Sequence, residues 1–241
     1  MTKSSSGTAK RFIPLVVLVA IGITIFALDL DEYLTFEALK ENHALLTDTV
    51  ARLGLAAILV YMLIYAVATA VSLPGGLVLT IVGGLLFGTW IGTIAVVIGA
   101  TIGATAIFLI AKTAFGDTLR ARAGPAIQKM EAGFQENAFN YLLVLRLIPL
   151  FPFWLVNLVP ALLGVRLGTY MAATFIGIIP GTFVIALTGA GLGSVLENNE
   201  EFSAEGIFTP EILAALVGLA VLAILPVAYK KIKARKDGAG S

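Results

Sequence analysis

The sequence contains no cysteine and a single histidine, His43, among its 241 residues. The absence of cysteine excludes disulfide bonds, thiolate metal ligands and cysteine nucleophiles. Charged residues make up 13% of the chain, where soluble domains average about 25%. The formal net charge of +1 lacks the strong positive balance that is typical of nucleic-acid-binding proteins. The sequence shows no nucleotide-binding loop, metal-ligand cluster or catalytic triad, so we expect neither an enzyme nor a bound cofactor or metal.

The chain is poor in charge but contains long apolar runs. Hydrophobic residues account for 59% of the chain, and its mean hydropathy is +0.97. A spanning helix needs about 20 apolar residues, and the pattern therefore predicts an all-α polytopic membrane protein. The run that begins at residue 12 follows three basic residues, and we interpret it as an uncleaved anchor rather than a signal peptide. The windows without Asp, Glu, Lys, Arg or His are residues 12–28, 54–111, 167–196 and 212–229.

Two apolar stretches are poorly suited to continuous helices. Residues 73–90 are interrupted by proline and glycine, and residues 144–165 read "VLRLIPLFPFWLVNLVPALLGV". Broken backbone is tolerated at membrane depth only where protein or a wet cavity covers it. We therefore expect two re-entrant helical hairpins, each with a partner spanning helix. The residues expected to shape them are Pro74, Gly75, Gly88, Pro149, Pro152 and Pro180.

The two interrupted stretches also resemble each other. Aligned without gaps, residues 74–109 and 152–187 are identical at ten of 36 positions, and Pro74 falls on Pro152. Corresponding segments broken by glycine and proline are typical of transporters built from inverted repeats, whose site lies at the repeat interface. The sequence thus predicts an internal, inverted repeat. The GxxxG pairs at 99 and 103 and at 177 and 181 are expected to pack helices closely.

We divide the chain into three parts. Residues 1–53 hold the anchor helix and an amphipathic segment, residues 54–193 the membrane core with both hairpins, and residues 194–241 an acidic loop, a last spanning helix and a basic tail. Basic residues cluster near the N-terminus, in the middle loop and in the C-terminal tail. Each of these three segments is therefore expected on the cytoplasmic side. Residues 73–90 form either a hairpin or a short broken crossing, and the number of full crossings stays open, as does assembly into a homo-oligomer.

Arg146 is the only charged residue of the second stretch. Placing arginine at the centre of a bilayer costs about 2.5–3.5 kcal/mol on insertion scales, so such residues face the protein interior or a wet path. A guanidinium pairs bidentately with phosphate oxygens, which points to an anionic headgroup. The alternative is a structural role, in which Arg146 pairs with Glu131, with Glu136, or with carbonyls freed by Pro149 and Pro152.

The candidate substrate-binding residues are Arg146, Asn157 and Glu131. Asn157 is expected either to form a hydrogen bond between the hairpins or to contact headgroups. Glu131 is a candidate partner of Arg146, or else it lies on the exposed face of an amphipathic helix at residues 124–137. Lys112 ends an apolar run and is expected to extend its amine toward the membrane surface, with a place in a site as the alternative. We assign no role to His43.

The combination of "SLPGG", "GGLLFG", "LRLIPLFPFWLVN" and "GIIPGTF" resembles the DedA superfamily, also called the VTT-domain or SNARE-associated Golgi protein family, in its Tvp/Tmem branch. The resemblance covers about residues 54–193. It implies two facing re-entrant hairpins and movement of lipids between leaflets. DedA members proper carry an acidic residue where this chain has Gly76 and a second arginine where it has Pro152. These departures argue against proton-driven transfer.

These observations lead to an expected function. We expect a scramblase- or flippase-like protein of the bacterial plasma (inner) membrane that passively moves lipids with anionic phosphate headgroups. Its partners would be membrane lipids, phospholipid or polyprenyl phosphate, and not nucleic acid. One alternative is a secondary transporter of a small solute or ion with the same hairpins. Another is a membrane organiser that transports nothing.

Overall fold

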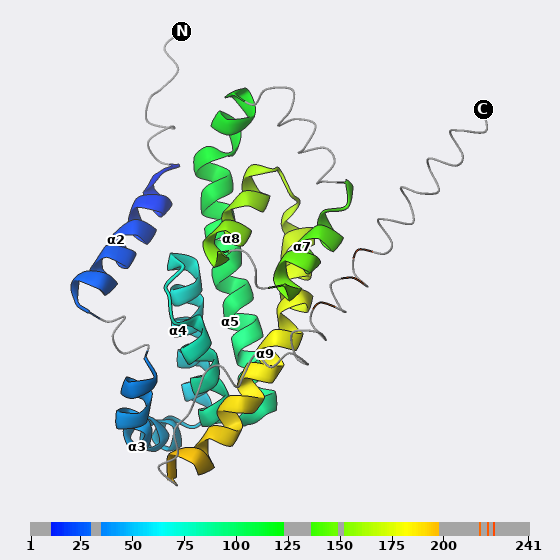
Figure 1. The fold of residues 1–241 in the computed structure, drawn as a ribbon. Helices are drawn as coiled ribbons and strands as arrows, with labels where there is room; N and C mark the ends of the chain where they lie inside the picture. Colours follow the sequence, from blue (N-terminus) through cyan, green and yellow to red (C-terminus); the bar gives the residue numbers. More distant parts are fainter. Residues whose placement is uncertain are drawn as a thin grey trace, which may run out of the picture.

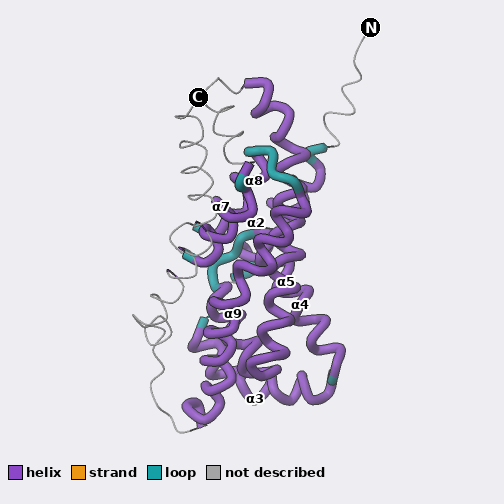
Figure 2. Tube along the Cα trace, turned by 90° about the vertical axis from the view of Figure 1, so that its right-hand side faces the viewer, coloured by secondary structure: helices purple, strands orange, loops and turns teal. Residues whose placement is uncertain are grey.

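A computed structural model describes residues 11–29, 35–122, 136–148 and 152–197, together with Val217, Val221 and Ile224. All the regular elements within these ranges are helices, and the described chain forms an elongated bundle (Figures 1 and 2). The predicted all-α class is therefore confirmed. The predicted acidic loop and basic tail lie outside the described residues, and so does nearly all of the amphipathic segment at 124–137. Of the last predicted span, only the three isolated positions are described.

The N-terminal part contains two helices of different character. α2 (Ile13–Ala27) is apolar all round and begins next to a proline. α3 (Phe36–Leu53) is amphipathic and begins at Thr35, whose Oγ1 accepts a hydrogen bond from the backbone N–H of Ala38 at 3.2 Å. This is an ordinary N-cap, which satisfies one of the free donors of the first turn. Gly54, with φ of 57°, separates α3 from the next helix.

α4 (Leu55–Val71) and the first part of α5 (Gly76–Arg122) form an antiparallel hairpin. α4 ends at Ser72, which has a φ of 58°, and Gly75, with φ of 98°, completes the turn. The hairpin is held together by hydrogen bonds between its arms. The Tyr61 hydroxyl donates to the carbonyl of Leu79 at 2.7 Å, and the hydroxyls of Tyr65 and Thr80 lie 2.9 Å apart.

Gly88 reverses the chain inside α5. Its φ of 75° and ψ of 172° are not helical, and only glycine adopts them readily. A side chain at Gly92 would collide with the backbone of Gly83, which shows how tightly the two parts of α5 fold back on each other. Residues 76–87 therefore form a short second arm, and residues 89–122 form a long helix after the reversal.

A second hairpin follows in the other half of the chain. α7 (Ala138–Leu147) and α8 (Phe153–Leu162) are its arms, and the long helix α9 (Leu167–Glu197) comes after it. Pro152 precedes α8, and Gly164, with φ of 69°, lies in the turn before α9. In Figure 1, the α4–α5 hairpin occupies the lower part of the bundle and the α7–α8 hairpin the upper part.

α5 and α9 run antiparallel through the centre of the bundle, where they make its most extensive contact. Phe108 stacks on Tyr170 near one end (centroids 4.3 Å apart), and Trp90 packs on Phe183 toward the other (5.2 Å). Both hairpins pack against this pair, since α4 contacts α5, and α7 contacts α9. The packed helices α5 and α9 thus fix the positions of the two hairpins.

Small residues let the helices approach closely. A Cβ at Gly103 would collide with the carbonyl oxygen of Ala66 on α4, and one at Gly99 would lie 2.9 Å from the carbonyl oxygen of Met62. The first GxxxG pair therefore packs as predicted. In the second pair, a Cβ at Gly177 would lie 2.7 Å from the Cβ of Arg146, but a Cβ at Gly181 would meet nothing within 4 Å, so close packing at Gly181 was a wrong prediction.

α4 exposes its most apolar face and buries its hydroxyls. Leu55, Leu59 and Leu63 are 83%, 68% and 66% exposed, whereas the opposite face carries the buried side chains of Tyr61, Tyr65 and Thr69. A contiguous apolar surface of this kind marks contact with another apolar phase. By length and composition, Gly76–Phe115 and Leu167–Gly191 qualify as bilayer-crossing helices, and in the first of them the continuous part is the helix after the reversal at Gly88. α2, α4, α7 and α8 are apolar but shorter.

Candidate functional site

Arg146 lies in the last turn of α7, and its guanidinium meets three neutral acceptors. Nη2 donates to Asn157 Oδ1 at 2.8 Å, to the Tyr170 hydroxyl at 3.0 Å and to Thr174 Oγ1 at 3.1 Å. Nη2 carries only two hydrogens, so at most two of these bonds are strong at one time. α8 supplies the amide and α9 supplies both hydroxyls, on successive turns. The site therefore joins all three helices of the second half.

No carboxylate compensates the charge of Arg146 within the described part of the chain. Glu136, the acidic residue nearest in sequence among those described, is exposed and forms no ion pair with it. The proposed pairing of Arg146 with Glu136 was therefore wrong. Glu131 and Pro149 lie outside the described residues. The Arg146 guanidinium thus keeps a net positive charge in a half-buried position among neutral groups.

Two N–H groups at the site are buried and have no acceptor among the described residues. They are Nε of Arg146 and Nδ2 of Asn157. The orientation of the Asn157 amide follows from its neighbours, because its oxygen accepts from both Arg146 and Tyr170. Buried donors are nearly always paired. The arrangement therefore suits an oxyanion, which accepts several hydrogen bonds and neutralises the guanidinium.

Aromatic rings flank the guanidinium. Cζ of Arg146 lies 5.6 Å from the ring centroid of Tyr170 and 5.8 Å from that of Phe153. Such contacts contribute about 0.5–2 kcal/mol, more where water is excluded. The Tyr170 hydroxyl also lies 3.3 Å from the carbonyl of Ala104, so the ring is fixed to α5 as well. These contacts help to hold the cation in place without a carboxylate.

A cavity of about 460 Å³ lies beside the turn of the first hairpin and extends to the start of α8. Pro74, Gly75 and Gly76 line it from the first turn, Phe153 from the start of α8, and Thr182 from α9. Phe153 also contacts the guanidinium of Arg146, so this ring links the cavity to the site. Pro74 and Gly75 therefore lie where the sequence predicted a break, and Gly88 ends the same hairpin.

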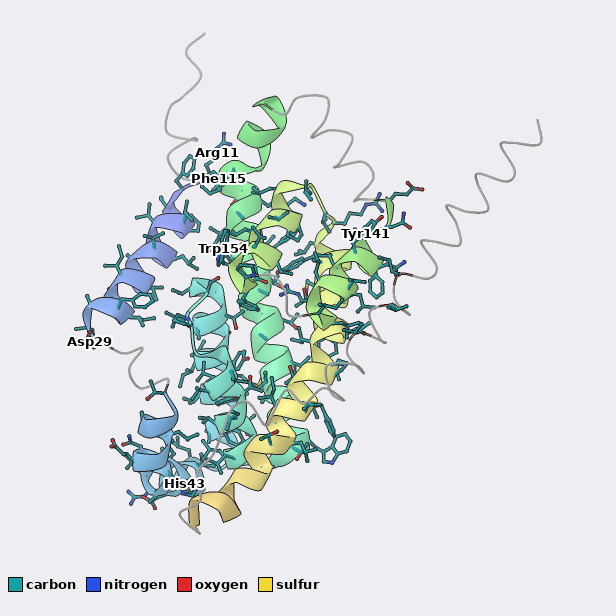
Figure 3. All side chains as sticks on the ribbon, viewed as in Figure 1. Arg11, Asp29, His43, Phe115, Tyr141 and Trp154 are labelled. Atoms are coloured by element: carbon teal, nitrogen blue, oxygen red, sulfur yellow. The ribbon has the colours of Figure 1, made fainter. Side chains whose placement is uncertain are left out.

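Two other predictions need correction. Pro180 lies inside α9, which continues as helix on both sides, so it shapes neither hairpin turn. A long helix tolerates one missing N–H donor when neighbouring turns and packed helices hold it. Asn157 bonds Arg146 across the two arms of one hairpin, and not between the two hairpins. His43 lies on α3 at the far end of the bundle from α7 and α8 (Figure 3).

Sequence reasoning missed Phe153, Tyr170 and Thr174. All three are neutral, and the search for a partner of Arg146 considered carboxylates and freed carbonyls only. One signal was present: Tyr170 and Thr174 are four residues apart on one helical face, in a run without Asp, Glu, Lys, Arg or His. Within the described residues, no three or more His, Cys, Asp or Glu side chains gather to form a metal site.

The fold and the site together define an all-helical protein with apolar helices long enough to cross a membrane and a half-buried cation among neutral acceptors. Residues 73–191 match the VTT domain. The chain belongs to the VTT-domain family, which is the DedA family. The family predicted from the sequence is therefore confirmed, and the prediction that the chain is a membrane protein is confirmed with it.

Relatives from both eukaryotes and bacteria support this assignment. The chain is 29% identical over 176 residues to the Transmembrane protein 41 homolog of Dictyostelium discoideum, a match that covers 70% of this chain and 49% of the relative. It is 35% identical over 127 residues to the uncharacterized protein YqeD of Bacillus subtilis, covering 52% and 54%. It is 27% identical over 175 residues to human Transmembrane protein 41B, covering 71% and 58%. The chain thus matches about half of each relative's length, and no solved structure matches it significantly.

Proposed function

We propose that this protein moves lipids with anionic phosphate headgroups passively between the two leaflets of the bacterial plasma membrane. The observation that carries the proposal is the Arg146 guanidinium, which is surrounded by neutral acceptors and whose own Nε, like Nδ2 of the neighbouring Asn157, is a buried donor without an acceptor among the described residues. A phosphate is an anion of suitable geometry for a guanidinium. A lipid keeps its tails in the bilayer while its headgroup enters the protein, and the apolar outer face of α4 suits that arrangement.

The hairpins supply the path. In the proposed architecture, the α4–α5 and α7–α8 hairpins enter the membrane from opposite faces as re-entrant elements and meet at the 460 Å³ cavity. An offset of 78 residues places Pro74 on Pro152, and it places the helix after Gly88 on α9. The antiparallel course of these two long helices supports an inverted repeat, because inversion reverses the direction of each equivalent helix. The site then lies at the interface between the two repeats.

Passive transfer follows from the groups at the site. Proton coupling requires a group at depth that gains and loses a proton, and arginine does not lose its proton in proteins. The described residues around Arg146 are Asn157, Tyr170, Thr174 and Phe153. None of them is a carboxylate or a histidine. The cation therefore stabilises a headgroup in the same way in both directions.

Reconstitution tests the proposal. The purified full-length chain is inserted into vesicles that contain fluorescent phosphatidylglycerol, and dithionite is added to the outside. We expect quenching to continue well beyond the outer leaflet, and to stop there in protein-free vesicles and in vesicles with Arg146→Ala. A trace that stops at the outer leaflet for the wild type would overturn the proposal. If such vesicles conduct a small solute instead, the protein is a transporter, and if they conduct nothing, it is a membrane organiser.

A further inference from the structure

Lys112 is a second cation with no carboxylate partner among the described residues. It lies on α5 directly after the charge-free window that ends at residue 111, and its side chain is half-buried. Its amine donates to the carbonyl of Val165 at 3.3 Å, which is long for a charged donor. It also lies 5.6 Å from the ring centroid of Phe108. These contacts use one of the three N–H donors of the ammonium group.

A column of aromatic rings connects Lys112 to Arg146. Phe108, which contacts the amine, stacks on Tyr170 with 4.3 Å between centroids and 23° between planes. Tyr170 in turn accepts a hydrogen bond from Arg146 and contacts its guanidinium. Phe108 and Tyr170 are fully buried. The two cations therefore lie at opposite ends of one rigid column.

The two cations lie at different positions along the bundle. Val165, whose carbonyl receives the amine, lies in the turn between α8 and α9. Figure 1 shows this turn in the upper part of the bundle, below the end of α5. Arg146 lies in the last turn of α7, near the hairpin turn and the cavity. Lys112 thus lies level with the α8–α9 turn, whereas Arg146 contacts Tyr170 and Thr174 further along α9, toward the cavity.

We infer that Lys112 is a further binding position for the anionic headgroup, which it receives at the membrane surface and from which the headgroup passes to Arg146. The inference rests on the proposed function of Arg146 and extends the same path outward. A lysine suits the outer position because its ammonium group is compact and its stem is flexible. The two donors that Val165 leaves available bind the first phosphate oxygens, and the aromatic column fixes the spacing between the two cations.

The matched control for Lys112 is Arg166. It follows Val165 directly, and its side chain is exposed, so it carries the same charge at the same end of the bundle. Its contact with the aromatic column is made by its backbone carbonyl, which accepts from the Tyr170 N–H and is kept in a side-chain variant. Lys112→Gln and Arg166→Gln each remove one positive charge. A difference between the two variants then reports on the position of Lys112 rather than on the net charge of the surface.

The experiment measures transfer of fluorescent phosphatidylglycerol and of zwitterionic phosphatidylcholine in vesicles that contain the full-length chain. We expect Lys112→Gln to slow phosphatidylglycerol by about tenfold, the equivalent of one charge-assisted hydrogen bond, and to slow phosphatidylcholine much less. Arg166→Gln should leave both rates close to wild type, and Lys112→Arg should restore most of the loss. Should the glutamine variant fail to fold, Lys112→Met replaces it, because its unbranched side chain fills similar space.

The outcomes separate this inference from the proposed function. If the wild type transfers neither lipid, the proposed function fails. If the wild type transfers phosphatidylglycerol and Lys112→Gln matches Arg166→Gln, the function stands and the role of Lys112 is overturned. Equal slowing of both lipids by Lys112→Gln would also overturn it, because loss of the Val165 contact alone would then explain the effect.

Discussion

The Arg146 guanidinium and the Asn157 amide oxygen lie 2.8 Å apart and join the two arms of the α7–α8 hairpin. Asn157 is completely buried, so its oxygen would remain unpaired if no donor reached it. Tyr170 provides a second donor to the same oxygen at 3.1 Å. The amide therefore keeps a partner when Arg146 is exchanged for another residue, and the hairpin does not depend on the cation alone.

We predict that Arg146→Ala abolishes transfer of anionic lipid while the protein still inserts and folds. Insertion becomes easier because a neutral residue costs less at depth than arginine, and Tyr170 still pairs with Asn157. Arg146→Lys should recover little activity, because an ammonium lacks the planar fork that binds phosphate. Vesicle transfer assays and size-exclusion chromatography measure the two properties. A folded Arg146→Ala protein with wild-type transfer would remove the anion site.

Tyr170→Phe should keep the stacking on Phe108 and lose only the hydroxyl. That hydroxyl accepts from Arg146 and lies within hydrogen-bonding distance of Asn157 Oδ1 and the Ala104 carbonyl. We expect a loss of stability of about 1–2 kcal/mol, as for a buried hydrogen bond, and slower transfer of phosphatidylglycerol. Thermal unfolding in detergent and the vesicle assay check both effects. Unchanged stability and unchanged transfer would show that the hydroxyl contributes nothing.

Two glycine substitutions form a matched pair for helix packing. Gly103→Ala places a methyl group against the carbonyl oxygen of Ala66, whereas Gly181→Ala meets nothing within 4 Å. Overpacking should destabilise the first variant by about 1–3 kcal/mol. The second should be neutral or stabilised by up to about 1 kcal/mol through better helix propensity. The melting temperatures of the two variants measure this difference, and equal melting temperatures would contradict close packing of α4 on α5.

Cysteine labelling distinguishes water-facing from lipid-facing positions, and the chain has no cysteine of its own. Cysteines at Gly76 and Pro152, near the two hairpin turns, should react with a small water-soluble thiol reagent. Cysteines at Leu59 and Leu63 should react slowly, although both positions are well exposed on the protein surface. The reason is that the reactive thiolate does not form in lipid. Fast labelling of the two leucine positions would show that α4 faces water.

A proton gradient should not drive transfer. The described contacts of Arg146 are neutral groups, so we expect the same rate in vesicles with and without an imposed pH difference. Glu131 lies outside the described residues and is the sequence-based candidate for a carrier. Repeating the measurement with Glu131→Gln tests it directly. A gradient dependence that disappears in this variant would make Glu131 a proton carrier and would end the passive interpretation.

Much of the backbone architecture could be predicted because proline and glycine act locally. Pro74 and Gly75 break the first hairpin where the sequence indicated, and Gly88 ends it. Arg146 could also be chosen as a candidate, since a lone charge in an apolar stretch is conspicuous. Its partners were not, because Tyr170 and Thr174 are neutral and reach it only through the packing of α9 on α7. Pro180 was wrongly predicted to shape a hairpin, because a proline within a long packed helix does not have to end that helix.

The two hairpin turns differ in chemistry, because the α4–α5 turn offers the hydroxyls of Tyr65 and Thr80 and only the α7–α8 hairpin holds a cation. In the proposed role, this asymmetry affects the speed of exchange and not its end point. A headgroup bound at Arg146 has the same free energy whichever leaflet it came from, so by detailed balance the site accelerates both directions by the same factor. A membrane that contains this protein would therefore lose compositional differences between its leaflets. Cells that maintain such differences would need a separate, energy-consuming pump.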